Sequence, residues 1–183
     1  MTTSVDEKIK SYIDLLKRYN SHTNVYAKSA YHRLDFHIED SIQLSNIIND
    51  HPGPIIDIGS GSGFPGIIMG IMLPDRPITL IDSKHKKTTF LTQVKDQLSL
   101  ENIQIITQNI NEYLHHHPHH QFGIVTAKAF GHYDKITPLA KQLLKKKGRL
   151  CLPISQHQHN EYPKHPQITT LKQPPYYYLI EQF

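Results

Sequence analysis

The chain of 183 residues contains a single cysteine, Cys151, and no tryptophan. One cysteine cannot form a disulfide within the chain, which excludes the disulfide-stapled class of small secreted domains and fits a reducing cytoplasm. Because Cys151 lies within the apolar run "GRLCLPI", we expect a small buried core residue there rather than a nucleophile. The expected location is therefore cytoplasmic.

Long apolar segments are also missing. The opening "MTTSVDEKIK" lacks the apolar region of a signal peptide, and no run of apolar residues is long enough for a transmembrane helix. A hydrophobic fraction of 38% still allows a folded core, and the 20% of charged residues have both signs. The net charge of +4 permits a nucleic-acid partner without requiring one, because basic charge is also ordinary surface solvation.

Apolar residues at helical spacing predict amphipathic helices over residues 5–20 and 35–50. From residue 54 onward, short apolar strands alternate with helices. Strands are expected at 54–58, 77–82, 102–107, 122–130 (including the residues that directly follow this strand) and 149–155. Helices are expected at 65–73, 83–100, 109–117 and 134–148. A closing hairpin is expected at 167–173 and 176–183. We expect Gly148 to end the last of these helices and the segment after residue 155 to contain little helix.

The stretch "DIGSGSGFPG", residues 57–66, follows the first of these strands and can be aligned to two glycine patterns. Gly61, Gly63 and Gly66 match the G-x-G-x-x-G fingerprint of dinucleotide-binding folds. Gly59, Gly61 and Gly63 instead suit a nucleoside cofactor without a pyrophosphate, such as S-adenosylmethionine (SAM). An acid after the second strand, here Asp82, binds ribose hydroxyls in both cases and cannot decide between them.

Two neighbouring residues favour SAM. Asp57 would attract the sulfonium and ammonium charges of the methionine end, whereas it would repel a pyrophosphate. A bulky Phe64 directly after Gly63 would crowd a pyrophosphate turn.

The alternation of strands and helices predicts an α/β fold with a mostly parallel sheet and ligands at the carboxyl ends of its strands. Together with the closing hairpin, it suits the Rossmann-like seven-stranded sheet of class I SAM-dependent methyltransferases, carried here by one domain over 1–183 with an N-terminal helical extension (1–50) capping the core (54–183).

At this point the sequence resembles the RsmG (GidB) family of bacterial 16S rRNA methyltransferases. The shared motifs are "HIEDS" (37–41), "DIGSGSGFPG" (57–66), "LIDSKHKKTTFLTQV" (80–94), "LENIQ" (100–104) and "FGIVTAKAF" (122–130), in the family's order and spacing. The resemblance covers roughly residues 5–155. It implies SAM-dependent methylation of a guanine N7 in 16S rRNA or the small ribosomal subunit, by a protein that we expect to be a monomer.

The resemblance also implies the site. The residues expected to contact SAM are Asp57, Gly59, Gly61, Gly63, Phe64, Asp82, Ile110, Asn111 and Lys128. His37 and Lys128 are expected to position the substrate. Guanine N7 already has an exposed lone pair, so we expect no catalytic base and no metal, only orientation and desolvation of the reactants.

Some positions depart from the family pattern. Lys128 stands where the family has an arginine, Asn111 where it has an acid, Pro153 where it has a lysine, and Phe36 where an arginine often occurs. Most of these changes remove basic groups that could face RNA. Two alternatives therefore stay open: a divergent methyltransferase acting on another substrate, and a non-catalytic ribosome- or RNA-binding module that keeps the fold. A nicotinamide-dependent oxidoreductase is a more distant alternative.

The tract "HHHPHH", residues 115–120, invites a metal-site interpretation because histidine is a common ligand. Pro118 interrupts the tract, no cysteine is nearby, and no pair of histidines has helical i, i+4 spacing on a confidently predicted helix. We therefore expect a polar surface loop.

Overall fold

The structure is a computed structural model of the whole chain, and it describes residues 4–117, 120–128, 133–161 and 168–183. Within these residues, seven strands form one sheet in the order β3-β2-β1-β4-β5-β7-β6. The strands are β1 (Ile55–Ile58), β2 (Ile78–Asp82), β3 (Ile103–Thr107), β4 (Phe122–Thr126), β5 (Leu144–Ile154), β6 (Ile168–Gln173) and β7 (Tyr176–Gln182). β1 to β5 pair in parallel, and β7 runs antiparallel to β5 and β6. The predicted seven-stranded α/β sheet is confirmed.

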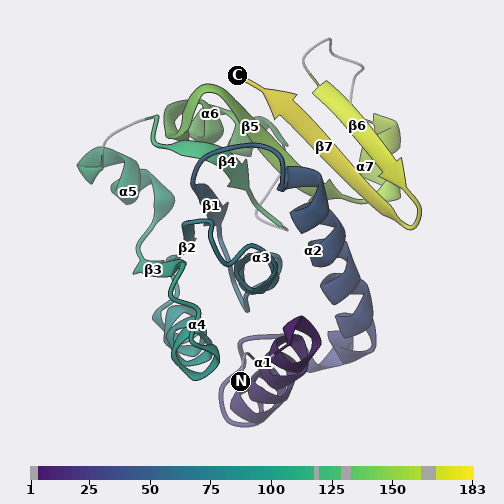
Figure 1. Cartoon of the computed structure of the whole chain (residues 1–183), viewed down its shortest axis with the longest axis vertical. Coiled ribbons are helices and arrows are strands. Elements are labelled where there is room, and N and C mark those ends of the chain that lie inside the picture. The colour runs from purple at the N-terminus through teal and green to yellow at the C-terminus, as the bar shows by residue number, and fades with distance from the viewer. Residues whose placement is uncertain (1–3, 118–119, 129–132, 162–167) are drawn as a thin grey trace.

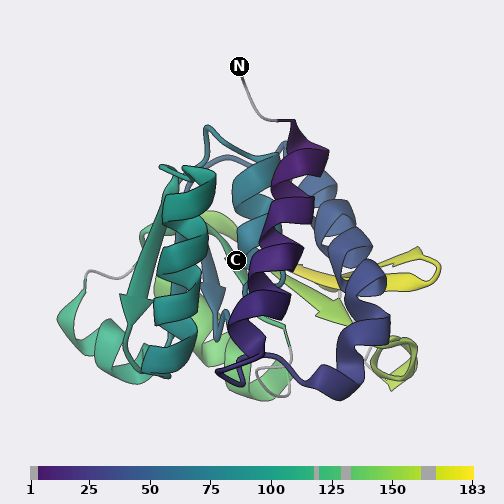
Figure 2. The same ribbon diagram turned by 90° about the horizontal axis from the view of Figure 1, so that it is seen from below.

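Helices cover both faces of this sheet (Figure 1). They are α1 (Val5–Asn20), the 3-10 helix η1 (Lys28–Arg33), α2 (Leu34–Ile48), α3 (Gly66–Met72), α4 (His85–Leu98), α5 (Ile110–His116), α6 (Tyr133–Leu143) and α7 (Gln156–Glu161). Figure 1 shows α3 surrounded by α1, α2 and α4, and in Figure 2 α1 runs between α4 and α2. One apolar core joins α1–α4 to the sheet, and a second core joins α5 and α6 to its other face.

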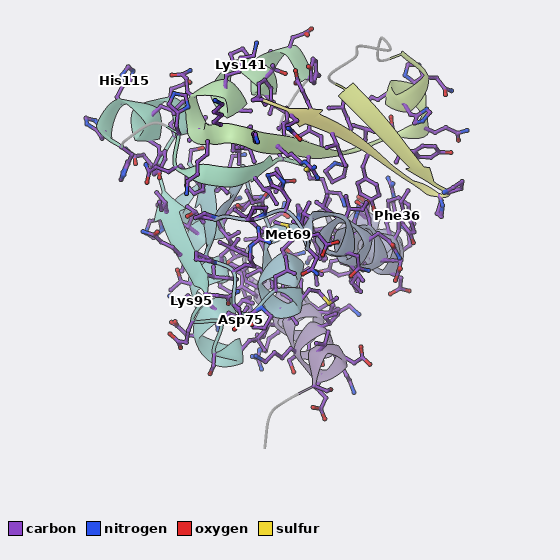
Figure 3. All side chains as sticks on the ribbon, turned by 45° about the horizontal axis from the view of Figure 1, so that its top comes forward. Phe36, Met69, Asp75, Lys95, His115 and Lys141 are labelled. Atoms are coloured by element: carbon purple, nitrogen blue, oxygen red, sulfur yellow. The ribbon has the colours of Figure 1, made fainter. Side chains whose placement is uncertain are left out.

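The strand residues divide between these two cores because side chains alternate along a strand. Ile55 belongs to the core beneath α1–α4, whereas Ile56 and Ile58 belong to the core beneath α5 and α6. Figure 3 shows Met69 of α3 in the crowded interior, with Lys95, His115 and Lys141 directed outward. Because α1 and α2 share a continuous core with the sheet, the expected helical cap is packed onto the Rossmann-like part.

The N-terminal helix is fixed at both its start and its middle. At its start, the Ser4 hydroxyl accepts the Glu7 N–H at 3.2 Å and the Glu7 carboxylate accepts the Ser4 N–H at 2.8 Å, a capping box. In the middle, the fully buried Tyr12 donates its hydroxyl to the Ser62 carbonyl at 2.7 Å. The helix therefore supports the glycine loop directly.

The predicted helix over 134–148 is wrong in its last five residues. α6 ends at Leu143, and residues 144–148 belong to β5. The backbone pairs across the sheet there, with Leu144 opposite Phe122, the Lys147 N–H donating to Phe183 and the Phe183 N–H donating to Gly148. Gly148 is therefore a strand residue and not a helix stop, because tertiary pairing outweighed a lysine-rich helical pattern.

A second correction concerns the segment after β5. It was expected to contain little helix, yet α7 spans Gln156–Glu161. Its start is capped reciprocally, because the Ser155 hydroxyl accepts the Gln158 N–H at 3.1 Å and the Gln158 side chain accepts the Ser155 N–H at 2.9 Å. This S-x-x-Q pattern was a readable signal. Cys151, in contrast, is confirmed as a buried core residue.

The order of the strands determines where a ligand can bind. The chain runs from β1 outward through β2 to β3, and then returns to place β4 on the other side of β1. Ligands in such sheets bind beyond the carboxyl ends of the strands at this reversal. None of the helices that the structure describes is long and apolar enough to cross a membrane.

Candidate cofactor and substrate site

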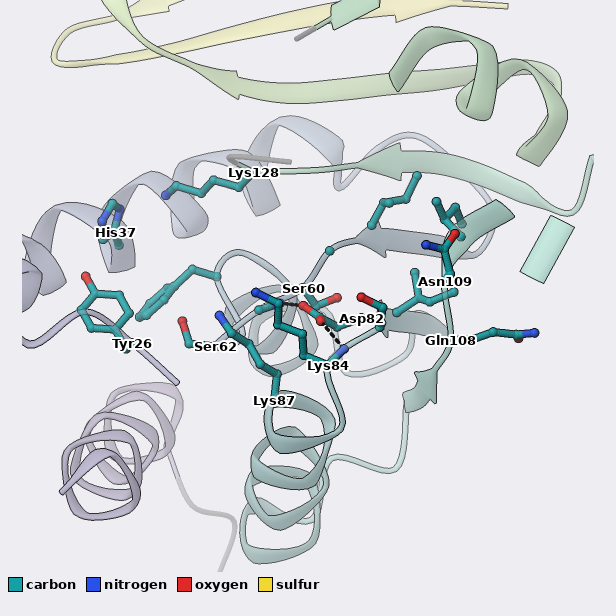
Figure 4. Close-up of a pocket in the computed structure, with 17 residues that line it drawn as sticks. Tyr26, His37, Ser60, Ser62, Asp82, Lys84, Lys87, Gln108, Asn109 and Lys128 are labelled. Atoms are coloured by element: carbon teal, nitrogen blue, oxygen red, sulfur yellow. Dashed lines mark hydrogen bonds between the residues drawn. The ribbon is translucent and has the colours of Figure 1, made fainter. Parts of the chain in front are cut away.

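A cavity of about 440 Å³ lies at this reversal (Figure 4). Sites of about 300–1,000 Å³ are typical for small molecules. The cavity wall comes from the segment between α1 and η1, from α2, from the glycine loop, from the ends of β1 to β4 and from the starts of α4 and α5. The lining residues are Tyr26, His37, Ile58, Gly59, Ser60, Gly61, Ser62, Phe64, Ile81, Asp82, Ser83, Lys84, Lys87, Gln108, Asn109, Ile110 and Lys128. Residues that are far apart in the sequence thus meet at one edge of the sheet.

The glycine loop has already used several of its backbone donors within the chain. The N–H groups of Gly59 and Ser60 donate to the Ile81 carbonyl, at 2.8 and 3.1 Å, and the Gly63 N–H donates to Ser60 at 2.8 Å. The Gly61 N–H donates to the Asp82 carboxylate at 2.9 Å. A pyrophosphate needs such donors for itself. The loop is therefore built to present its surface to a ligand, not to cradle a phosphate.

Asp57 lies beneath this loop and has no exposed surface. Its carboxylate faces the start of α3, since a Cβ atom placed on Gly66 would lie 2.7 Å from Oδ2. Neither carboxylate oxygen has a well-formed hydrogen bond with the part of the chain that the structure describes. Burial raises the pKa of Asp57 to about 7, against the opposing effects of Ser60, Gly66 and Lys128. The chain's own acid thus occupies the helix end where a dinucleotide fold would bind phosphate.

The raised pKa of Asp57 predicts how the free energy of unfolding should depend on pH. Between pH 3.8 and about 7 the folded chain holds a proton on Asp57 that the unfolded chain has lost, so this residue's contribution to stability falls as pH rises through that window. We expect the free energy of unfolding of the wild type, relative to an Asp57→Asn variant, to decline over this range and to level off above it. Urea unfolding of both ligand-free proteins across the pH range measures the difference, and a difference that does not change with pH contradicts it.

Asp82 ends β2 and faces the cavity. Its Oδ2 accepts the Gly61 N–H at 2.9 Å, and its Oδ1 accepts the Lys84 N–H at 2.8 Å (Figure 4). A carboxylate has about four acceptor positions, so two remain available. The two backbone bonds hold the carboxylate in one orientation, from which it can accept a pair of hydroxyl groups of a ribose.

Lys128 follows β4 and is paired with Asp40, the acid of the HIEDS motif, to which the sequence analysis assigned no role. Its ammonium donates to Oδ2 of Asp40, in α2, at 2.6 Å, and the two side chains are only 17% and 5% exposed. Burial lowers the pKa of Lys128, and the attraction of Asp40 opposes that change. The ion pair joins the N-terminal helical part to the carboxyl end of β4 and balances the charge of Lys128 on that side of the cavity.

Removing the negative partner is expected to destabilise the fold. An Asp40→Asn variant leaves the Lys128 ammonium buried without its counter-ion, which should lower the free energy of unfolding by about 2–4 kcal/mol. Adding Lys128→Met should restore much of that loss, so chemical denaturation of the single and double variants forms a double-mutant cycle. Asp35→Asn, an exposed acid on the same helix, is the matched control. Equal stabilities for Asp40→Asn and Asp35→Asn would contradict the expectation.

His37 also lines the cavity, one helical turn before Asp40. Its Nδ1 atom is buried and has no hydrogen-bond partner among the described residues. Burial, followed by the nearby charges of Lys128 and Arg33, lowers the pKa of His37 to about 4. The ring is therefore neutral at physiological pH, with one nitrogen that donates and one that accepts.

Comparison with known proteins decides the family. The sequence model of GidB, rRNA small subunit methyltransferase G, matches residues 5–177. The chain belongs to the GidB family. Proteins named ribosomal RNA small subunit methyltransferase G are similar in sequence: that of Chromobacterium violaceum is 34% identical over 78% of this chain, and that of Hydrogenovibrio crunogenus is 30% identical over 91%.

The chain matches only part of the length of these GidB relatives. The matches cover 67% of the Chromobacterium protein and 75% of the Hydrogenovibrio protein. The namesake from Fusobacterium nucleatum is 42% identical over 58% of this chain, but that match covers 46% of the relative. For some curated relatives, then, the match spans about half of their length.

Solved structures confirm the fold. A methyltransferase from Geobacter sulfurreducens superposes with a TM-score of 0.66 over 94% of this chain and 87% of that protein, at 7% identity. A precorrin-6y C5,15-methyltransferase from Geobacter metallireducens superposes with a TM-score of 0.58 over 79% of this chain and 87% of that protein, at 14% identity. At such low sequence identities, the similarity to these two proteins shows only that the folds are alike.

The predicted site residues divide into two groups by position. The cavity is lined by Gly59, Gly61, Phe64, Asp82, Ile110, Lys128 and His37. Asp57, Gly63 and Asn111 do not line it. Asp57 is buried under the loop and Gly63 packs against α1 and α3, so both support the wall from behind. A cofactor contact by any of these residues stays a prediction.

Asn111 does not line the cavity. It is an exposed residue in the first turn of α5, and its N–H donates to the side chain of Asn109 at 2.9 Å. Gln108 and Asn109, which precede the helix, line the cavity instead. The end of β3 was a usable signal, since ligand-facing residues follow the strands directly. Tyr26 was also missed, and no local pattern marks it.

Of the histidine tract, His115 and His116 end α5, and none of its described members lines the cavity. His117 stacks on Tyr113 with ring centroids 4.0 Å apart, while Pro118 and His119 lie outside the described residues. Among the residues that the structure describes, no group of three or more potential ligands is placed to hold a metal ion.

Proposed function

We propose that this chain is a SAM-dependent methyltransferase acting on N7 of a guanine in 16S rRNA. Membership of the GidB family and the names of its relatives support the reaction. The observation that carries the cofactor assignment is that Asp82 is bonded to the glycine loop, in which the N–H groups of Gly59, Ser60, Gly61 and Gly63 already donate within the chain. Such a site suits a nucleoside without a pyrophosphate. A cytoplasmic location and action as a monomer are part of the proposal.

The residues that line the cavity fit the parts of such a cofactor. Asp82 holds the ribose hydroxyls, and Ile110 with Asn109 flanks the adenine. The surface of Gly59 and Gly61 accommodates the methionine end, with Asp57 buried behind it. When bound, SAM supplies an electrophilic methyl group for an in-line displacement.

The chain's own contribution to the reaction is positioning. Lys128 offers ammonium N–H groups to an acceptor such as guanine O6, while Asp40 balances its charge. This balance matters because the guanine ring becomes positively charged on methylation, and an uncompensated cation beside it would oppose the reaction. His37 is neutral and adds no repulsion. No catalytic base is needed, since N7 has a free lone pair.

Two measurements test the proposal. Calorimetry with S-adenosylhomocysteine should show binding to the purified chain, and expression of the chain in a bacterial strain lacking its own GidB protein should restore 7-methylguanosine in 16S rRNA. Absence of binding at millimolar ligand overturns the cofactor assignment. Binding with methyl transfer to other molecules but not to 16S rRNA favours a divergent methyltransferase. Binding without any transfer favours a non-catalytic ribosome-associated module.

A further inference from the structure

One end of the cavity is aromatic. Tyr26, His37 and Phe64 line it, with ring centroids 6.3 Å apart for Tyr26–His37, 6.2 Å for Tyr26–Phe64 and 5.9 Å for His37–Phe64. Figure 4 shows Tyr26 and His37 on one side of Ser60 and Asp82, with Asn109 on the other. The proposed nucleoside end and this aromatic end are therefore separate, and the glycine loop lies between them.

We propose that Tyr26 and His37 hold the methyl-accepting base, Tyr26 by stacking on its ring and His37 by hydrogen bonding to its edge. This inference rests on the proposed function; it adds Tyr26 to the substrate site and gives His37, which the family resemblance already implied there, a specific contact. Enzymes that modify a base in RNA hold it between aromatic or apolar side chains and contact its polar edge. The aromatic end supplies both kinds of contact beside Lys128.

The polar contact is available because His37 is not committed within the chain. Its Nδ1 lacks a hydrogen-bond partner among the described residues, although the atom is buried. Because Nδ1 is enclosed by the protein, the nitrogen that a ligand in the cavity can reach is Nε2, which has no hydrogen bond to the described residues, and a hydrogen bond there gains affinity. The depressed pKa of His37, about 4, keeps the ring neutral beside a base that becomes cationic.

The ring of Tyr26 is held in place before any base arrives. The buried Asn20 accepts the Tyr26 N–H at 3.0 Å and donates to the Tyr26 carbonyl at 2.8 Å. The Tyr26 hydroxyl donates to the Ala30 carbonyl at 3.1 Å, and Tyr31 stacks on the ring at 5.8 Å. A pre-positioned ring loses little conformational entropy on binding. The N-terminal helical part thereby acquires a role in substrate binding.

A kinetic experiment separates base binding from cofactor binding. With undermethylated small-subunit rRNA as substrate, Tyr26→Ala should raise KM for the RNA about tenfold, the size expected for loss of one base–aromatic stack. Tyr26→Phe should restore most of the affinity, because stacking needs only the ring. The affinity for S-adenosylhomocysteine, measured by calorimetry, should stay within about twofold in both variants. Tyr19→Ala is the matched control, since Tyr19 contacts Phe90 in the same region and does not line the cavity.

A spectroscopic experiment needs no catalytic turnover. The chain has no tryptophan, so a Tyr26→Trp variant carries the only indole fluorophore. Titration of this variant with 7-methylguanosine, in the presence of S-adenosylhomocysteine, should quench its fluorescence, whereas a Tyr19→Trp variant should show no saturable change.

The two proposals can fail separately. If the wild type binds S-adenosylhomocysteine and methylates the RNA while Tyr26→Ala leaves KM unchanged, the role of Tyr26 is overturned and the proposed function stands. Loss of S-adenosylhomocysteine affinity in place of RNA affinity, or equal quenching in the two tryptophan variants, also overturns it. If the wild type binds no S-adenosylhomocysteine and transfers no methyl group, the proposed function itself fails.

Discussion

A Gly63→Ala variant is expected to lose about 2–4 kcal/mol of unfolding free energy and most of its affinity for S-adenosylhomocysteine. Gly63 has a φ of +106°, which side-chain-bearing residues rarely adopt. A Cβ atom there would lie 2.6 Å from Cγ1 of Ile67 and 2.9 Å from the Tyr12 hydroxyl. Both neighbours are fully buried, so they cannot move away without shifting α1 or α3.

Gly61→Ala provides the comparison within the same loop. Gly61 also has a positive φ, +59°, but the nearest atoms to a Cβ there are Nζ of Lys87 at 3.5 Å and the Gly59 carbonyl at 3.6 Å. Space is available, so we expect a loss of only about 1 kcal/mol from the backbone conformation. Chemical denaturation measures both variants. Equal losses would show that the backbone angle, rather than the packing behind the loop, limits substitution.

An Asp82→Asn variant is expected to bind S-adenosylhomocysteine about a hundredfold more weakly than the wild type, because hydrogen bonds to charged groups contribute about 1.5–3 kcal/mol. The carboxylate now accepts from the N–H groups of Gly61 and Lys84 through its two different oxygens. An amide has one oxygen, so its NH₂ group must face one of these donors. The substitution therefore disturbs both the ribose contact and the shape of the glycine loop.

Calorimetry gives the affinity of each variant for S-adenosylhomocysteine. The free energy of unfolding, measured separately, shows how far the substitution disturbs the structure of the glycine loop. Asp75→Asn, at an exposed acid in the turn before β2, is the control and should bind as the wild type does. A change of less than threefold in the affinity of Asp82→Asn would exclude Asp82 as a ribose ligand. A loss of stability without a loss of affinity would assign the carboxylate to loop structure only.

Local patterns in the sequence predicted the elements that alternate regularly, because a buried strand followed by an amphipathic helix has few other ways to fold. They failed at residues 144–148, where a lysine-rich run continues a helical pattern but its backbone pairs with Phe122 and Phe183. Strand pairing depends on what lies beside the chain, and no local propensity contains that information. The capped α7 was a different kind of miss, since the signal at Ser155 and Gln158 was present.

By itself the sequence determined the seven-stranded α/β class, the glycine loop and the acid after β2, because each follows from local spacing. Only the tertiary structure decided which residues share the cavity. It buried Asp57 under the loop, paired Lys128 with Asp40 across 88 positions of the chain, and brought Tyr26 beside His37 and Phe64. The physical reason is that burial and pairing depend on packing between elements distant in sequence, whereas a motif records only its neighbours along the chain.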